Sequence, residues 1–196
     1  MPTVWAHRLY NRIGAPFLFV ISDFFWYRKE ESMKKVGILM GSDSDLPVIR
    51  KATAVLDQFG VPYEVHVYSA HRTPLEACEF AEKAASRGFG ALICAAGMAA
   101  HLAGVVASKT ILPVIGIPCK GANLDGLDAL LSTVMMPSGI PVATVAVDGG
   151  ANAALLACQM LALLDESLAE ALRAKRESDR LAVLAKNAKV EEEFNK

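Results

Sequence analysis

The chain has 196 residues, of which 53% are hydrophobic, and its 20 basic and 21 acidic residues leave a formal net charge of −1. This length is enough for one α/β domain with a buried core and an appendage. Because the charge balance is near neutral and no basic stripe is present, a nucleic-acid partner is not expected.

The four cysteines lie far apart, in apolar or helical surroundings, and form no C-x-x-C pair. No histidine stands near any of them at the spacing of metal ligands. This usage predicts reduced and mostly buried thiols in a cytoplasmic protein, and no structural zinc site. The four are Cys78, Cys94, Cys119 and Cys158.

The first 32 residues differ from the rest of the chain. Arg8 and Arg12 precede an apolar run at 15–21, and an aromatic cluster follows at 24–27. This pattern could be a poor signal peptide or an interfacial anchor, but the run is too short to span a bilayer and no small-residue cleavage site follows it. Since Met33-Lys34-Lys35 resembles a natural start immediately before the first predicted strand, we expect residues 1–32 to be a dispensable extension or a misassigned start, poorly ordered or loosely docked.

From Met33 onward, short β-branched runs alternate with helical patterns. The predicted strands are 36–40, 63–67, 91–95, 114–117 and 142–147. The predicted helices follow them, up to about 59, over 75–87, from after 104 to before Pro113, over 124–135 and over 151–164. Five β–α units with short connections predict a parallel sheet with helices on both faces. We therefore expect residues 33–164 to form a three-layer α/β/α, flavodoxin-like domain with strand order 2-1-3-4-5.

A last helix is predicted from about 165 to 188, in a segment rich in Ala, Leu, Glu, Lys and Arg. We expect no room on the completed domain for its apolar stripe, which consists of Leu168, Leu172, Leu181 and Leu184. A helix with an unburied stripe usually packs on another subunit. The segment 165–196 is therefore predicted to reach a neighbouring copy in a homo-oligomer, and the alternative is a solvated tail.

Three loops should meet at the carboxyl edge of the first three strands, where parallel sheets place their ligands. The loop at 42–45 combines serines with a helix start, where free N–H groups suit a phosphate and Asp45 could accept hydrogen bonds from ribose hydroxyls. Simple helix capping by Ser and Asp explains the same residues. The small residues at 97–104 would let a flat ligand approach the backbone.

The loop at 69–74 supplies a possible proton carrier beside a possible anion anchor. His71 has an imidazole, Arg72 a guanidinium that can grip a phosphate, and Ser69 a hydroxyl. This set suggests an enzyme acting on a phosphorylated substrate, although His-Arg on a loop is often only solvated surface. His101, in the third loop, is a weaker candidate because it could simply hydrogen-bond its own loop.

Four motifs together resemble the 5-(carboxyamino)imidazole ribonucleotide mutase family of purine biosynthesis. The resemblance runs from Lys35 to Leu164, and the motifs are Gly-Ser-Asp-Ser-Asp at 41–45, Ser-Ala-His-Arg-Thr-Pro at 69–74, Gly-Met-Ala-Ala-His-Leu at 97–102, and 136–144. It implies a homo-octamer with exchanged C-terminal helices, a small nucleotide substrate, and no metal or organic cofactor. Neither a membrane nor a nucleic acid is implied as a partner.

The resemblance also assigns roles to individual residues. His71 matches the catalytic histidine, Ser42 and Asp45 match first-loop substrate contacts, and Arg72 matches the phosphate-side contact. Further pocket positions are matched by Ser44, Ser69, Gly97 and Leu102. Met135 departs from the family pattern, in which Gln commonly precedes the Met-Pro pair.

The implied reaction moves a carboxylate from the exocyclic nitrogen of aminoimidazole ribonucleotide to its ring carbon, with one histidine acting as acid and then base. One alternative is a related carboxylase that uses free carbon dioxide, whose members lack the Gly-Met-Ala-Ala-His-Leu loop. Another is a non-catalytic nucleotide- or flavin-binding module, since a fold does not determine function.

Overall fold

The computed structural model of the protein describes residues 33–195. The predictions made for residues 1–32 lie outside this range. In the described part of the chain, no helix combines the length and apolar character needed to cross a bilayer.

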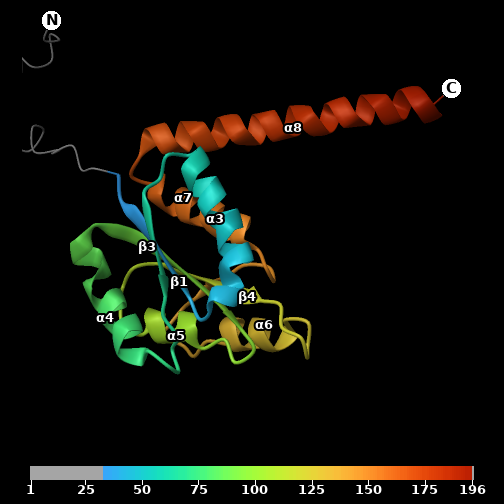
Figure 1. Ribbon diagram of the computed structural model, residues 1–196. Helices are drawn as coiled ribbons and strands as arrows, with labels where there is room; N and C mark the ends of the chain where they lie inside the picture. Colours follow the sequence, from blue (N-terminus) through green and yellow to red (C-terminus); the bar gives the residue numbers. More distant parts are fainter. Residues whose placement is uncertain (1–32, 196) are drawn as a thin grey trace, which may run out of the picture. The chain divides into compact units, whose positions relative to one another are not determined.

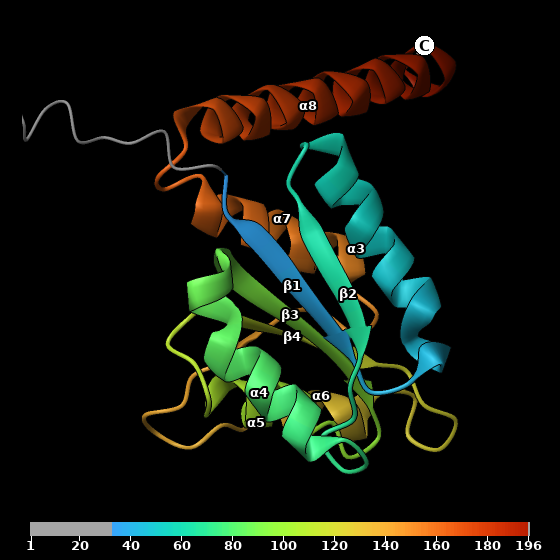
Figure 2. The ribbon, with the colours of Figure 1, turned by 60° about the vertical axis from the view of Figure 1, so that its left-hand side comes forward.

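Five parallel strands form one sheet in the order β2-β1-β3-β4-β5, which confirms the predicted topology. Figure 2 shows β2, β1, β3 and β4 in this order. The strands are β1 Lys35–Met40, β2 Tyr63–Val67, β3 Phe89–Gly97, β4 Val114–Cys119 and β5 Ala143–Thr144. The central strands β1, β3 and β4 are almost entirely buried, as expected for strands covered on both faces. The second strand has the predicted bounds, and β3 is longer at both ends than its prediction.

Helices cover both faces of the sheet, as Figure 1 shows. They are α3 Leu46–Gln58, α4 Pro74–Ala84, α5 Leu102–Ala107, α6 Leu127–Val134, α7 Gly150–Leu161 and α8 Glu166–Phe194, with short 3-10 turns η1 Asp43–Asp45 and η2 Ala85–Arg87. One hydrophobic core lies between the sheet and α3, α7 and the start of α8, and a second lies under α4 and α5. Successive side chains of a buried strand point to opposite faces of the sheet, so Ile38 packs in the first core and Leu39 in the second.

The fifth strand is much shorter than the predicted range 142–147, because only Ala143 and Thr144 pair with β4. The carbonyl of Pro118 on β4 accepts the Asp148 N–H at 2.9 Å, so that side of Pro118 faces β5. A strand residue directs its N–H and its carbonyl to the same side, and Pro has no N–H to donate. The ladder between β4 and β5 therefore ends before Pro118.

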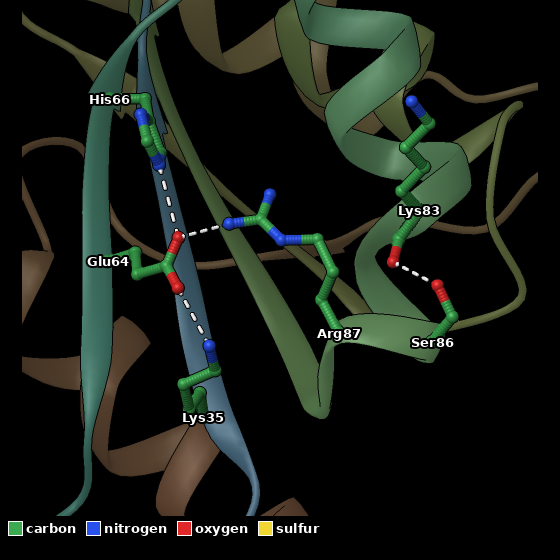
Figure 3. Close-up of polar contacts among 6 residues, drawn as sticks. All are labelled: Lys35, Glu64, His66, Lys83, Ser86 and Arg87. Atoms are coloured by element: carbon green, nitrogen blue, oxygen red, sulfur yellow. Dashed lines mark hydrogen bonds and ion pairs between the residues drawn. The ribbon is translucent and has the colours of Figure 1, made fainter.

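At the opposite end of the sheet from the carboxyl edge, Glu64 joins β2 to its neighbours (Figure 3). Its carboxylate accepts a hydrogen bond from Lys35 Nζ at 2.7 Å and another from Arg87 Nη2 at 2.6 Å, and it lies 3.5 Å from His66 Nε2. The hydrogen bond from Lys35 is the main cause that lowers the pKa of Glu64. The Arg87 guanidinium also lies over the ring of Phe80. This cluster fixes the β2 edge of the sheet.

The C-terminal helix α8 divides into a buried start and an exposed remainder. Leu168 and Leu172 are buried in the core that α3 and α7 share. The prediction that these two leucines find no room on the domain was therefore wrong, because α8 packs back on α7 before it runs beyond the sheet (Figure 1). Leu181 and Leu184 are about half exposed, as predicted for an unpartnered stripe.

Candidate functional site

A pocket of about 560 Å³ lies at the carboxyl edge of the sheet, formed by the loops after β1, β2, β3 and β4. Its volume is in the range of small-molecule sites. All eight residues proposed for the site from the sequence line it: Ser42, Ser44, Asp45, Ser69, His71, Arg72, Gly97 and Leu102. The structure thus brings the three predicted loops together around one cavity.

In the loop after β1, a serine caps the first turn. Ser42 is extended, and its Oγ accepts a hydrogen bond from the Ser44 N–H at 3.3 Å. Asp45 lies at the start of α3, but its side chain makes no capping hydrogen bond there. The capping interpretation therefore holds for Ser42 and not for Asp45, whose carboxyl faces the pocket instead.

Asp45 is a buried carboxyl, with 9% of the residue exposed. This burial raises the pKa of Asp45, and hydrogen bonds from the Ser42 backbone and the Cys119 thiol offset it only in part. Asp148 adds a repulsive charge that acts in the same direction as burial. The pKa of the Cys119 thiol rises to about 12, first because it is buried and then because Asp45 is near. Burying the Asp45 carboxyl costs folding free energy. Carboxyl groups with a perturbed pKa are common in ligand-binding and catalytic sites.

The loop after β2 is folded around the Ser69 hydroxyl. Ser69 Oγ accepts hydrogen bonds from the backbone N–H groups of His71 and Arg72, each at 3.3 Å. The Ser69 N–H donates to Thr73 Oγ1 at 2.8 Å, and the Thr73 hydroxyl donates back to the Ser69 carbonyl. The turn is thus closed by its own side chains, and His71 and Arg72 are held at fixed positions on the pocket wall.

Arg72 links two of the loops. Its Nη2 donates to the carbonyl of Gly41 at 3.1 Å, so the guanidinium extends from the end of β2 to the end of β1. A guanidinium has five N–H donors. Further donors are therefore available to an anion in the pocket.

Two imidazoles meet across the pocket. His71 Nε2 lies 2.8 Å from His101 Nδ1, and the rings contact edge to face with centroids 5.0 Å apart. In such a contact one nitrogen carries the proton and the other offers a lone pair. His101 therefore does more than hydrogen-bond its own loop, because it orients the His71 ring and can exchange a proton with it.

The loop after β3 is held in an uncommon conformation. Met98 has a φ of 54°, in the left-handed region that a residue with a side chain seldom adopts. The adjacent Gly97 lies against β4, where an added Cβ would come 3.4 Å from the Cys119 carbonyl. Leu102 is buried at the start of α5 and closes the apolar side of the pocket.

Sequence reasoning missed the loop after β4, which supplies Lys120 and Gly121 to the pocket. The sequence feature that could have indicated this loop is its place shortly after a predicted strand, because ligands bind at the carboxyl ends of parallel strands. Met135, the departure from the family pattern, is 76% exposed at the end of α6 and is not among the pocket-lining residues that the structure describes. Within residues 33–195, no group of three or more His, Cys, Asp or Glu side chains is arranged to hold a metal ion.

A flavodoxin-like sheet with cationic and imidazole groups in a pocket at its carboxyl edge defines an α/β protein suited to a small anionic ligand. Residues 35–181 match the model of the family described as AIR carboxylase. The chain therefore belongs to the AIR carboxylase family.

Named relatives agree with this assignment. The chain is 54% identical over 157 residues to N5-carboxyaminoimidazole ribonucleotide mutase of Pyrococcus horikoshii, a match that covers 80% of this chain and 89% of that protein. It is 51% identical to phosphoribosylaminoimidazole carboxylase of Schizosaccharomyces pombe, where the match covers 80% of this chain but 28% of the longer protein. The crystal structure of Treponema denticola PurE superposes with a TM-score of 0.71 at 30% identity, covering 79% of this chain and 96% of that one.

Proposed function

We propose that this protein is a 5-(carboxyamino)imidazole ribonucleotide mutase of purine biosynthesis, which moves a carboxylate from the exocyclic nitrogen of aminoimidazole ribonucleotide to its ring carbon. The observation that carries the proposal is the match to the mutase of P. horikoshii, at 54% identity over 89% of that protein. The pocket adds the chemical support, since it joins a pair of imidazoles to cationic and hydroxyl groups.

The reaction needs one proton to be delivered and another to be removed. A carbamate releases carbon dioxide when its nitrogen is protonated and its C–N bond breaks. The ring carbon then attacks the carbon dioxide, a C–C bond forms, and the ring proton leaves. His71 can donate the first proton and accept the last, so it returns to its starting state in each turnover. The pocket, with the substrate bound in it, would keep the small neutral intermediate close to the ring carbon.

The residues around His71 fit the parts of a ribonucleotide. Arg72 and the serine-rich loop at 42–45 would hold the phosphate, because they offer a guanidinium and hydroxyl groups on adjacent loops. Asp45 would accept hydrogen bonds from the ribose hydroxyls. Ser69, Gly97 and Leu102 would shape the wall against which the imidazole ring lies.

Asp45→Asn is expected to raise stability while it weakens substrate binding. Burial raises the pKa of Asp45, so the folded state binds a proton more tightly than the unfolded state does, and stability falls as pH rises through the interval above the ordinary Asp value of about 4. Removing the charge should therefore increase the thermal midpoint at pH 7. Loss of charge-assisted hydrogen bonds to ribose should weaken nucleotide binding about 10- to 100-fold.

Thermal unfolding between pH 4 and 8 and titration with aminoimidazole ribonucleotide measure the two effects. Asp57→Asn is the matched control, because Asp57 lies near the other end of α3 and does not line the pocket. Unchanged binding by the Asp45 variant would contradict the ribose contact.

Turnover of the purified protein distinguishes the candidate functions. One assay supplies 5-(carboxyamino)imidazole ribonucleotide without ATP or added bicarbonate, and the other supplies aminoimidazole ribonucleotide with excess bicarbonate. Fast conversion of the first substrate is the expected result. Efficient use of the second alone would indicate a carboxylase, as in the name of the S. pombe relative, and no turnover of either would indicate a binding module.

The chain is further proposed to act as a homo-octamer in the cytoplasm, with residues 165–196 packed on a neighbouring copy. The exposed Leu181 and Leu184 on α8 support self-association, as does a hollow of about 380 Å³ between α7 and α8. The four free thiols suit a reducing compartment. Light scattering should give eight times the mass of one chain, and a Leu181→Asp/Leu184→Asp double variant should give a smaller assembly.

A further inference from the structure

The loop after β4 presents a lysine whose main chain is fixed from outside the loop. The Lys120 N–H donates to Asp148 Oδ1 at 2.9 Å. Asp148 is in turn held by its own N–H, which donates to the Pro118 carbonyl at 2.9 Å, and it has a φ of 55°. A residue with a side chain adopts this backbone region at a cost. The position of Lys120 on the pocket wall is therefore set by a contact with the segment that follows β5.

The Lys120 side chain already binds a carboxylate, but at an exposed position. Its Nζ lies 2.7 Å from Asp125 Oδ1, and the two side chains are 57% and 78% exposed. Exposed ion pairs contribute little to stability, so another carboxylate can replace Asp125 at little cost. A carboxylate that enters the pocket would therefore take the place of Asp125 at the Lys120 ammonium group.

Two cationic side chains line the pocket at separate positions. Within residues 33–195, Arg72 and Lys120 are the Arg and Lys side chains that line it. They follow β2 and β4, and both β1 and β3 lie between these strands in the sheet. The proposed substrate also has two anionic groups, a phosphate on the ribose and a carboxylate on the imidazole. If Arg72 faces the phosphate, Lys120 is the cation that remains for the carboxylate.

We propose that Lys120 binds the carboxylate of the substrate and so distinguishes carboxylated from non-carboxylated aminoimidazole ribonucleotides. This inference rests on the proposed function, because it takes its ligand from that reaction. Asp45 lies in the same pocket, and its carboxyl would repel the carboxylate of the substrate unless a cation lies near that carboxylate. Lys120 supplies such a cation.

The test compares two ligands that differ by one carboxylate. Calorimetric titration measures the binding of aminoimidazole ribonucleotide and of its 4-carboxylate to the full-length protein. Lys120→Gln is expected to weaken binding of the 4-carboxylate about tenfold and to change binding of the non-carboxylated ligand less than twofold. Lys120→Arg, which keeps the charge, should bind the 4-carboxylate within about threefold of the unsubstituted protein.

Lys109→Gln is the matched control. Lys109 also forms an exposed ion pair, at 3.3 Å from Glu82, and it does not line the pocket. Equal loss of both ligands in Lys120→Gln would mean that Lys120 contacts the phosphate or supports the loop, and no loss would mean that it does not touch the ligand. Either result overturns the proposal. Failure of the proposed function would appear separately, as absent turnover in a protein that still binds the 4-carboxylate through Lys120.

Discussion

Replacing His71 by Asn is expected to lower kcat on 5-(carboxyamino)imidazole ribonucleotide by at least about 10³-fold, with nucleotide binding changed less than about threefold. One imidazole serves both proton transfers in the proposed reaction, so its loss removes the acid and the base together. The ring lies on the pocket wall and is held there by a loop that closes on Ser69, so Asn should leave the loop intact. Steady-state rates and a separate titration with aminoimidazole ribonucleotide measure the two quantities.

Two other histidines provide comparisons for this experiment. His66→Asn is the control, because His66 lies on the strand that precedes the same loop and contacts Glu64 outside the pocket. His101→Leu should lower kcat less than His71→Asn does, by about tenfold, because His101 orients the His71 ring without replacing it. Turnover of the His71 variant within tenfold of the unsubstituted enzyme would contradict the assignment of the proton carrier.

Gly150→Ala is expected to cause the largest loss of stability among single substitutions considered for this fold, about 2–4 kcal/mol. Gly150 is the first residue of α7, and a Cβ added there would overlap the backbone carbonyl oxygen of Val48 on α3. Backbone atoms cannot turn aside as a side chain can, so one of the two helices must shift. For a domain of this size, the thermal midpoint should fall by roughly 5–15 °C.

The matched control is Gly104→Ala in α5. An added Cβ there would lie 3.1 Å from the Sδ of Met136, which is the flexible end of a side chain, and Ala favours a helix more than Gly does. This variant should stay within about 1 kcal/mol of the unsubstituted protein in chemical denaturation. Equal stability of the two variants would mean that α3 and α7 are not in close contact at Gly150. Because α3 begins directly after Asp45, a shift of α3 in Gly150→Ala should also weaken nucleotide binding.

The sequence predicted the parts of this protein that depend on local pattern. Buried β-branched runs located every strand, and the parallel order of the first three strands placed the loops containing Ser42, Ser69 and Gly97 at one edge. The parts that it missed depend on contacts between distant residues. The length of β5 is set by a proline on β4, and the burial of Leu168 depends on how the chain turns between α7 and α8.

The same distinction holds within the pocket. Ser69, His71 and Arg72 lie in one hexapeptide, so their joint presence was visible from the sequence. The contact between His71 and His101 joins residues 30 positions apart and requires both loops to close over β1. The main-chain position of Lys120 depends on a hydrogen bond to Asp148, which is 28 positions away. A pattern of neighbouring residues could therefore not identify Lys120 as a pocket residue.

The distribution of the thiols has a practical consequence for spectroscopy. Cys94, Cys119 and Cys158 are buried, and burial raises the pKa of Cys158 to about 11, so these sulfurs resist alkylation at neutral pH. Cys78 is only partly buried on α4, the helix that starts directly after the loop of His71 and Arg72. A maleimide fluorophore would therefore attach at Cys78 without any engineered cysteine, and its emission would report ligand-dependent movement next to the pocket.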